Sequence, residues 1–122
     1  MEKEIRIIFI DEAKNELNKL KQDINIELIE GKIGTYKQKL LKSIEDTVHK
    51  IVMNPLYGIN IKKYLIPNYF KIRYDVNNLR KCNLFDFWRL IYTLRGNNEI
   101  IVIDIIEFTD HKDYNKRFGY KS

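Results

Sequence analysis

The most apolar stretch of this chain is residues 99–108, where isoleucine, valine and phenylalanine are interrupted only by Glu99, Asp104 and Glu107. A run so rich in β-branched residues is typical of a strand that is covered on much of both faces. A second strand-like segment, residues 87–94, precedes it, and the connection Gly96-Asn97-Asn98 predicts a hairpin loop. The end of the chain therefore predicts an antiparallel hairpin built around an interior strand.

The first half of the chain predicts one strand followed by two helices. Residues 5–10 are mostly β-branched, and Asp11 is placed to cap a helix that extends to about residue 29. A second helix is expected over residues 35–53, ending where Pro55 disfavours helical geometry in Asn54. Apolar side chains recur every three or four positions in both segments: Ala13, Leu17, Leu20, Ile24 and Leu28, then Tyr36, Leu40, Ile44, Val48 and Ile51. Because the break at Gly31 to Gly34 is short, the helices should pack antiparallel.

The middle of the chain is less regular. Residues 56–68 predict a connector, after which Pro67 could open a short helix over residues 68–75, although the aromatic residues there would also tolerate a strand. Residues 79–84 predict a strand between turns at Asn77-Asn78 and Phe85-Asp86. The expected fold is α+β: an N-terminal strand and an α-helical hairpin packed in two layers on a mostly antiparallel sheet, with a short C-terminal helix.

The two-residue period of a strand assigns side chains of residues 87–94 to opposite faces of the sheet. One face receives Trp88, Leu90, Tyr92 and Leu94, and the other receives Arg89, Ile91, Thr93 and Arg95. The first set should pack under the helices, which leaves Arg89 on an uncovered face. If the register allows, the neighbouring strand places Arg80 and Cys82 beside it. An anionic ligand would then explain the proximity of two guanidinium groups, unless each pairs with a carboxylate such as Asp104 or Glu107 or lies apart in water.

A closing helix is expected after Thr109. Asp110 fits its N-cap and Asp113 follows three residues later, as in a capping box. His111 and Tyr114 are three positions apart and should share one face of this helix. A histidine can exchange a proton near neutral pH, and a tyrosine can orient a phosphate or stack on a base, although such a pair also serves packing. The other histidine, His49, is expected on the surface of the second helix.

Length, composition and charge indicate which broad class of protein this chain belongs to. A chain of 122 residues suits a single domain over residues 1–122, and no apolar run is long enough to cross a bilayer or to act as a signal peptide. The lone Cys82 forms no internal disulfide and no cysteine metal cluster, which favours the cytoplasm. Residues 1–30 contain five lysines and arginines and eight acidic residues, which gives a charge of 5 − 8 = −3. Residues 31–122 carry 17 − 9 = +8, and the two parts add up to the net charge of +5. Nucleic acid is the natural partner of that basic part, unless the lysines merely solvate helix faces.

The order of elements, the segment Trp88-Arg-Leu-Ile-Tyr92 and the segment His111-Lys-Asp-Tyr114 resemble the RelE/ParE superfamily of type II toxin–antitoxin toxins. The order covers nearly the whole chain and the motifs about a third of it. The closing segment is similar in particular to a group of archaeal RelE-like proteins. This resemblance implies a RelE-like fold and a toxin that cuts messenger RNA on the ribosome, is silenced by a cognate antitoxin, and needs neither metal nor cofactor.

The resemblance also implies roles for individual residues. Arg89 and Arg80 would neutralise the scissile phosphate, His111 would protonate the leaving 5′-oxygen, and Tyr114 matches the terminal aromatic residue. Cys82 departs from the pattern, because a lysine often stands there. The general base stays open between Tyr114 and Glu107. Phosphate contacts that read no sequence are expected from Lys62, Lys63, Lys81, Lys112, Lys116 and Arg117.

Two other functions are compatible with the same residues. A ParE-like member would inhibit a topoisomerase by binding it and would cleave no RNA; the presence of His111 argues against this interpretation. A RelE-fold protein without catalytic activity would bind an antitoxin or nucleic acid, an interpretation that Cys82 favours.

Overall fold

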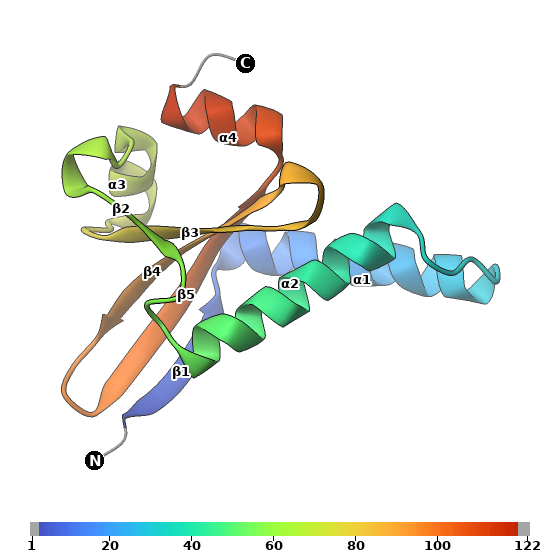
Figure 1. The fold of residues 1–122 in the computed structure, drawn as a ribbon, viewed down its shortest axis with the longest axis horizontal. Helices are drawn as coiled ribbons and strands as arrows, with labels where there is room; N and C mark the ends of the chain where they lie inside the picture. Colours follow the sequence, from blue (N-terminus) through green and yellow to red (C-terminus); the bar gives the residue numbers. More distant parts are fainter. Residues whose placement is uncertain (1–2, 120–122) are drawn as a thin grey trace.

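The computed structural model describes residues 3–119, and the expected domain bounds of 1–122 extend beyond them at both ends. The fold is α+β, with helices on a five-stranded sheet whose order is β1-β5-β4-β3-β2 (Figure 1). In chain order the elements are β1 (Glu4–Phe9), α1 (Asp11–Ile29), α2 (Tyr36–Met53), β2 (Ile59–Ile61), η1 (Lys63–Leu65), α3 (Asn68–Tyr74), β3 (Leu79–Asn83), η2 (Phe85–Phe87), β4 (Arg89–Gly96), β5 (Ile100–Thr109) and α4 (His111–Phe118). Within residues 3–119, no helix is both long and apolar enough to cross a membrane.

The sheet is mixed but mostly antiparallel, as expected. β1 pairs in parallel with β5, while β5, β4, β3 and β2 pair antiparallel in succession. A parallel neighbour requires a crossover connection, and the helices α1 and α2 begin that connection. Figure 1 shows these two helices side by side and extending past the sheet. That overhang explains why Leu28, expected to face the core, is 52% exposed.

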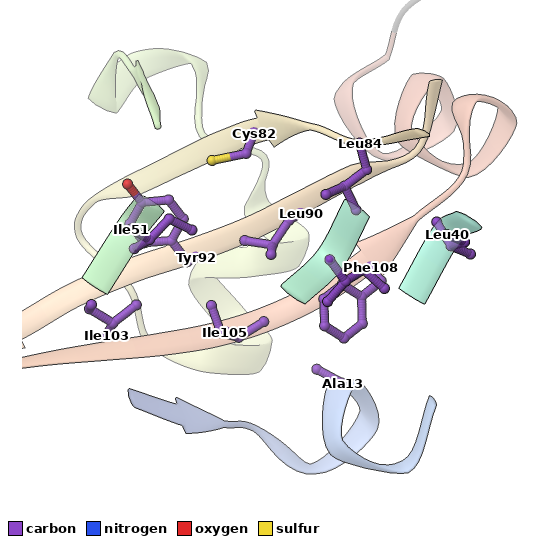
Figure 2. Packing of buried hydrophobic residues seen from close by; sticks show 11 residues of the cluster. Ala13, Leu40, Ile51, Cys82, Leu84, Leu90, Tyr92, Ile103, Ile105 and Phe108 are labelled. Carbon is purple, nitrogen blue, oxygen red and sulfur yellow. The ribbon is translucent and has the colours of Figure 1, made fainter. Parts of the chain in front are cut away.

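The first face of the sheet, which α1 and α2 cover, holds the larger core. Strand residues such as Leu90, Tyr92 and Ile105 are fully buried there against Ile51 of α2 and Ala13 of α1 (Figure 2). The predicted alternation along β4 is confirmed, because Leu90 and Tyr92 belong to this core with Trp88 and Leu94 packed against it. The helical period likewise predicted the inward Leu40, Ile44, Val48 and Ile51 of α2, whereas Tyr36, expected in the same stripe, is 48% exposed.

The second face of the sheet, which was expected to be uncovered, is covered as well. Ile91 of β4 and Ile106 of β5 are buried there with Phe70 of α3 and Tyr114 of α4. The two-layer arrangement is therefore wrong, since α3 and α4 add a layer. Sequence patterning missed it because α3 is only seven residues long and α4 is mostly polar.

Several local expectations are confirmed and others need correction. Pro67 opens α3, and Asp110 caps α4 by accepting a hydrogen bond from the Asp113 N–H at 2.8 Å. Asp11 is the first residue of α1 and not its cap, because Ile10 occupies that position without a side-chain hydrogen bond. β2 falls inside the segment expected to be a connector, since three residues are too few for a recognisable alternation.

β4 begins two residues later than expected because a tight turn occupies its predicted start. Asp86 and Phe87 in η2 have φ values of 52° and 63°. This left-handed conformation is one that residues with a side chain rarely adopt. At the other end, Gly96 has a φ of 139°, and an added Cβ would lie 2.1 Å from the Ile100 carbonyl oxygen. The hairpin loop therefore requires glycine at this position.

Candidate nucleic-acid interface

Two cations from neighbouring strands meet at one tyrosine ring on the second face of the sheet. Lys81 of β3 donates a hydrogen bond from Nζ to the Tyr114 hydroxyl at 2.8 Å. Its Nζ lies 5.2 Å from the centroid of that ring, and the Arg89 guanidinium carbon lies 5.3 Å from the same centroid. The Tyr114 hydroxyl therefore holds the Lys81 ammonium, while the face of the ring attracts the Arg89 guanidinium.

The register of the sheet determines which basic residues meet. Lys81 lies opposite Ile91 and Asn83 opposite Arg89, so Lys81 and Arg89 point to the same face. Arg80 lies opposite Tyr92 and points to the first face instead, where it donates to the Gly58 carbonyl at 2.7 Å. The expectation that Arg80 joins Arg89 is therefore wrong, and the adjacent Lys81 takes that place.

Neither cation has an acidic partner among residues 3–119. No carboxylate of the described chain lies within 4.0 Å of Lys81 or Arg89. The two acidic residues that could have neutralised this face are already engaged: Asp104 binds Arg95 at 2.7 Å, and Glu107 binds Arg117 at 3.0 Å. The positive charge of Lys81 and Arg89 is thus available to an anion.

Arg89 is oriented by the backbone of the turn before β4. Its Nη1 donates to the Phe87 carbonyl at 2.8 Å and to the Trp88 carbonyl at 3.2 Å. The left-handed residues of this turn are energetically costly, by about 1–2 kcal/mol each for a residue with a side chain. That conformation directs the Phe87 carbonyl to the guanidinium, so the turn fixes the position of Arg89.

His111 is the first residue of α4 and is exposed to solvent. Its ring lies 5.9 Å from that of Phe87, and its Nε2 lies 3.3 Å from the Asn115 amide nitrogen. Asn115 is 9% exposed, so it offers a fixed polar partner to the exposed imidazole. Because Arg89 pairs with Thr109 across the sheet, two positions before His111, the imidazole and the guanidinium belong to the same corner of the fold.

Tyr114 contributes as a buried residue. It is 4% exposed, and its ring stacks on Phe118 with 4.5 Å between centroids. A ring so covered offers no open face to a nucleobase, so stacking on RNA is not its role. It holds the Lys81 ammonium by its hydroxyl and attracts Arg89 through its ring.

A small pocket adjoins Lys81 and Tyr114. It measures about 190 Å³ and is lined by Ile59, Asn60, Ile61, Lys62, Leu65, Lys81, Tyr114 and Phe118. Lys62 and Lys81 therefore line the same pocket. Lys63, Lys112 and Lys116 are exposed, whereas Arg117 is half-buried beside Glu107 and lies 3.9 Å from the centroid of the Tyr69 ring. Arg117 is therefore a structural residue and not an open phosphate contact.

The remaining residues singled out in the sequence lie elsewhere. Cys82 is buried on the first face and not beside Arg89, and burial raises the pKa of its thiol to about 11 and keeps it protonated. His49 is exposed on α2, as expected. Among residues 3–119, no three histidine, cysteine or acidic side chains are grouped so that they could hold a metal ion.

Sequence reasoning missed two neighbouring residues, Phe87 and Asn115, and did not place Lys81 beside Arg89. The dipeptide Arg80-Lys81 carried the signal, because consecutive residues of a strand point to opposite faces and only one of them can join Arg89. The choice between them requires the register. We found no matching family model, curated protein or solved structure.

Four carboxyls gather where α1, β5 and α4 approach one another, those of Glu12, Glu16, Glu107 and Asp113. Burial raises the pKa of Glu107 on β5, and its Oε2 has no hydrogen-bond partner among the described residues. Partial burial, followed by the charges of Glu107, Glu12 and Asp113, raises the pKa of Glu16 on α1 to about 7. The ionised form of Glu16 therefore opposes folding.

The substitution Glu16→Gln is expected to stabilise the protein at pH 8 and to have little effect at pH 4. The folded-state pKa of about 7 exceeds the ordinary value of 4.5, so the penalty is lacking below pH 4.5, grows between these values and is complete above pH 7. Although neighbouring groups partly desolvate the Glu16 carboxyl, the residue as a whole remains exposed, so screening by solvent limits the gain to about 1 kcal/mol or less. Urea unfolding at both pH values measures it, with the exposed Glu99→Gln as control. An equal gain at both values would contradict the role assigned to ionisation.

Proposed function

We propose that this chain is a RelE-like toxin that binds messenger RNA on the ribosome and cleaves it without a metal ion, under the control of a cognate antitoxin. The observation that carries the proposal is the pair Lys81 and Arg89. These two cations come from adjacent strands and contact the same tyrosine, Tyr114. Within residues 3–119 no carboxylate pairs with either of them, and His111 lies at the same corner of the fold. Such an arrangement suits a phosphodiester and the charge that develops on it.

The architecture supports the same proposal. An N-terminal strand, an α-helical hairpin and an antiparallel set of strands ending in a short helix is the arrangement that the sequence resemblance implies. The additional α3 on the second face departs from the two-layer expectation. Arg89 and His111 stay outside this packing, because α3 contributes Phe70 to a cluster with Leu79, Ile91 and Ile106.

The proposed chemistry is internal transesterification. The RNA 2′-oxygen attacks the adjacent phosphorus, the bond from phosphorus to the 5′-oxygen breaks, and a 2′,3′-cyclic phosphate remains. Protonated His111 donates its proton to the departing 5′-oxygen, and Lys81 and Arg89 stabilise the additional negative charge on the phosphoryl oxygens.

The base for this reaction is assigned to water or to the ribosome. Tyr114 is 4% exposed with its hydroxyl bound to Lys81, and Glu107 is 6% exposed and paired with Arg117. Neither side chain can therefore contact the 2′-hydroxyl of an RNA bound at the protein surface. The 2′-proton therefore passes to solvent or to a ribosomal group that aligns the RNA.

The phosphates on either side of the cleaved bond would contact the outer lysines. Lys62 lies in the pocket beside Lys81, and Lys63 follows it in η1. Lys112 and Lys116 are four residues apart and hence on one side of α4. Contacts of this kind are independent of sequence and weaken as salt increases.

Induced expression followed by mapping of messenger RNA ends on ribosomes tests the proposal. The chain has two histidines, which makes His49→Ala a matched control for His111→Ala. The native chain and His49→Ala are expected to arrest growth and to create new RNA ends. His111→Ala should reduce the number of new RNA ends by at least about a hundredfold, the lower end of the usual contribution of a general acid. Arrest without new ends would indicate a ParE-like topoisomerase inhibitor and would overturn the proposal.

One observation favours a second function, RNA binding without cleavage. Tyr114 is buried and Arg80 is turned to the first face, so two of the four residues expected to catalyse do not face a substrate. In that case the purified chain would bind single-stranded RNA with a strong salt dependence, Lys81→Ala would weaken the binding, and the mapping experiment would give no new ends.

A further inference from the structure

A groove of about 300 Å³ lies on the first face of the sheet, between the α1 and α2 pair and the strand ends. It is lined by Glu16, Leu17, Lys19, Leu20, Asp23, Leu40, Ile44, Trp88, Phe108, Asp110 and Asp113. The cluster of Lys81, Arg89 and His111 contributes no side chain to this lining. The groove is therefore a separate feature of the molecule.

The floor of the groove is apolar. Leu40, Ile44 and Phe108 belong to the larger core on the first face of the sheet. Leu17 and Leu20 of α1 pack against that core. The groove's volume of about 300 Å³ is at the lower end of ligand sites in proteins. It suits one or two large apolar side chains better than an extended ligand.

The rim of the groove is acidic, although the chain as a whole has a net charge of +5. Glu16, Asp23, Asp110 and Asp113 contribute carboxylates against the single ammonium of Lys19. Asp23 is partly neutralised by Lys37 at 2.9 Å, and Asp110 also caps α4. The rim nevertheless remains negative, so it repels RNA and attracts a basic partner.

We infer that this groove is a docking site for a segment of a partner protein in which one or two large apolar residues are flanked by lysine or arginine. The apolar residues would fill the floor, and the flanking cations would contact Glu16, Asp110 and Asp113 at the rim. The inference does not rest on the proposed nuclease activity, because it uses no residue assigned to RNA.

The charge of the rim should depend on pH through Glu16. The groups that face its carboxyl are Glu12 on α1, Glu107 on β5, and Asp113 and Arg117 on α4. Partial burial and the acidic neighbours raise its pKa to about 7, so the rim gains negative charge as the pH rises from 6 to 8. Affinity for a basic segment should increase over the same interval.

Trp88 provides a direct measure of occupancy. It is the only tryptophan of the chain and lines the groove, with its Nε1 donating to the Tyr36 hydroxyl at 2.9 Å. The purified protein is titrated with a short tryptophan-free peptide that has a leucine-isoleucine centre flanked by lysines. A saturable change in tryptophan emission is expected. A peptide with glutamate flanks, and one with a serine centre, should each bind at least about tenfold more weakly.

Matched variants of the protein separate the rim from general charge effects. The double variant Glu16→Gln/Asp113→Asn should weaken the lysine-flanked peptide by about tenfold. Glu30→Gln/Glu99→Gln removes the same charge at exposed positions outside the groove and should bind as the native chain does. Circular dichroism establishes that each variant is folded.

Three outcomes would overturn the inference. The lysine-flanked and glutamate-flanked peptides could bind equally, the emission of Trp88 could stay unchanged at saturating peptide, or the emission could shift on concentrating the protein alone. The last result would show that the groove is covered by a second copy of the chain.

Discussion

Replacing Lys81 with alanine is expected to lower the rate of RNA cleavage by about a hundredfold, while Arg80→Ala stays within about threefold of the native rate. Lys81 is held at the Tyr114 hydroxyl beside Arg89, whereas Arg80 points to the opposite face and binds backbone carbonyls. If Arg89 holds the phosphate as proposed, Lys81 lies where it can stabilise the charge and Arg80 does not. Arg89→Ala should lose about as much as Lys81→Ala, and the double variant more than about a thousandfold.

The measurement is ribosome-dependent cleavage of a defined messenger RNA in vitro, with rates corrected for the folded fraction of each variant. The comparison is sharp because Lys81 and Arg80 are adjacent in the chain and both cationic, so that non-specific charge effects are matched. Equal losses from the two variants would show that charge alone matters. A loss from Arg80→Ala alone would mean that the catalytic surface lies on the first face.

Phe70→Ala is expected to lower the free energy of unfolding by about 3–5 kcal/mol. Phe70 is fully buried on the second face, where its ring lies 5.6 Å from that of Phe118 on α4. Truncation leaves a cavity beneath both α3 and α4, because the closely packed surroundings cannot collapse to fill it. The cluster buried on the second face also contains Tyr114, so the position of Lys81 should become less fixed.

Ile72→Ala on the same helix is the control for this prediction. Ile72 is 84% exposed. Its truncation should therefore change the free energy of unfolding by no more than about 0.5 kcal/mol. Equilibrium unfolding in urea, followed by Trp88 fluorescence and far-ultraviolet circular dichroism, measures both variants. A Phe70→Ala effect as small as that of Ile72→Ala would mean that α3 does not cover the sheet.

Local sequence determined most elements of this fold. The period of Leu40, Ile44 and Ile51 identified α2, and the alternation of Leu90 and Tyr92 identified the face of β4 that packs under the helices. Both signals are reliable because the geometry of a helix or strand fixes which of its own side chains share a face. A proline and a capping carboxylate likewise marked the starts of α3 and α4, since each acts on the nearest backbone groups.

Only the tertiary structure decided what lies beside Arg89. The sequence placed Arg80 and Lys81 in one strand, but a shift of one residue in register exchanges their faces, and no local pattern fixed it. The second layer was hidden for a similar reason: α3 and α4 are short, and their burial depends on Phe70 and Tyr114 meeting from distant parts of the chain. Periodicity records how an element is divided into faces, whereas pairing and packing between elements determine which faces meet.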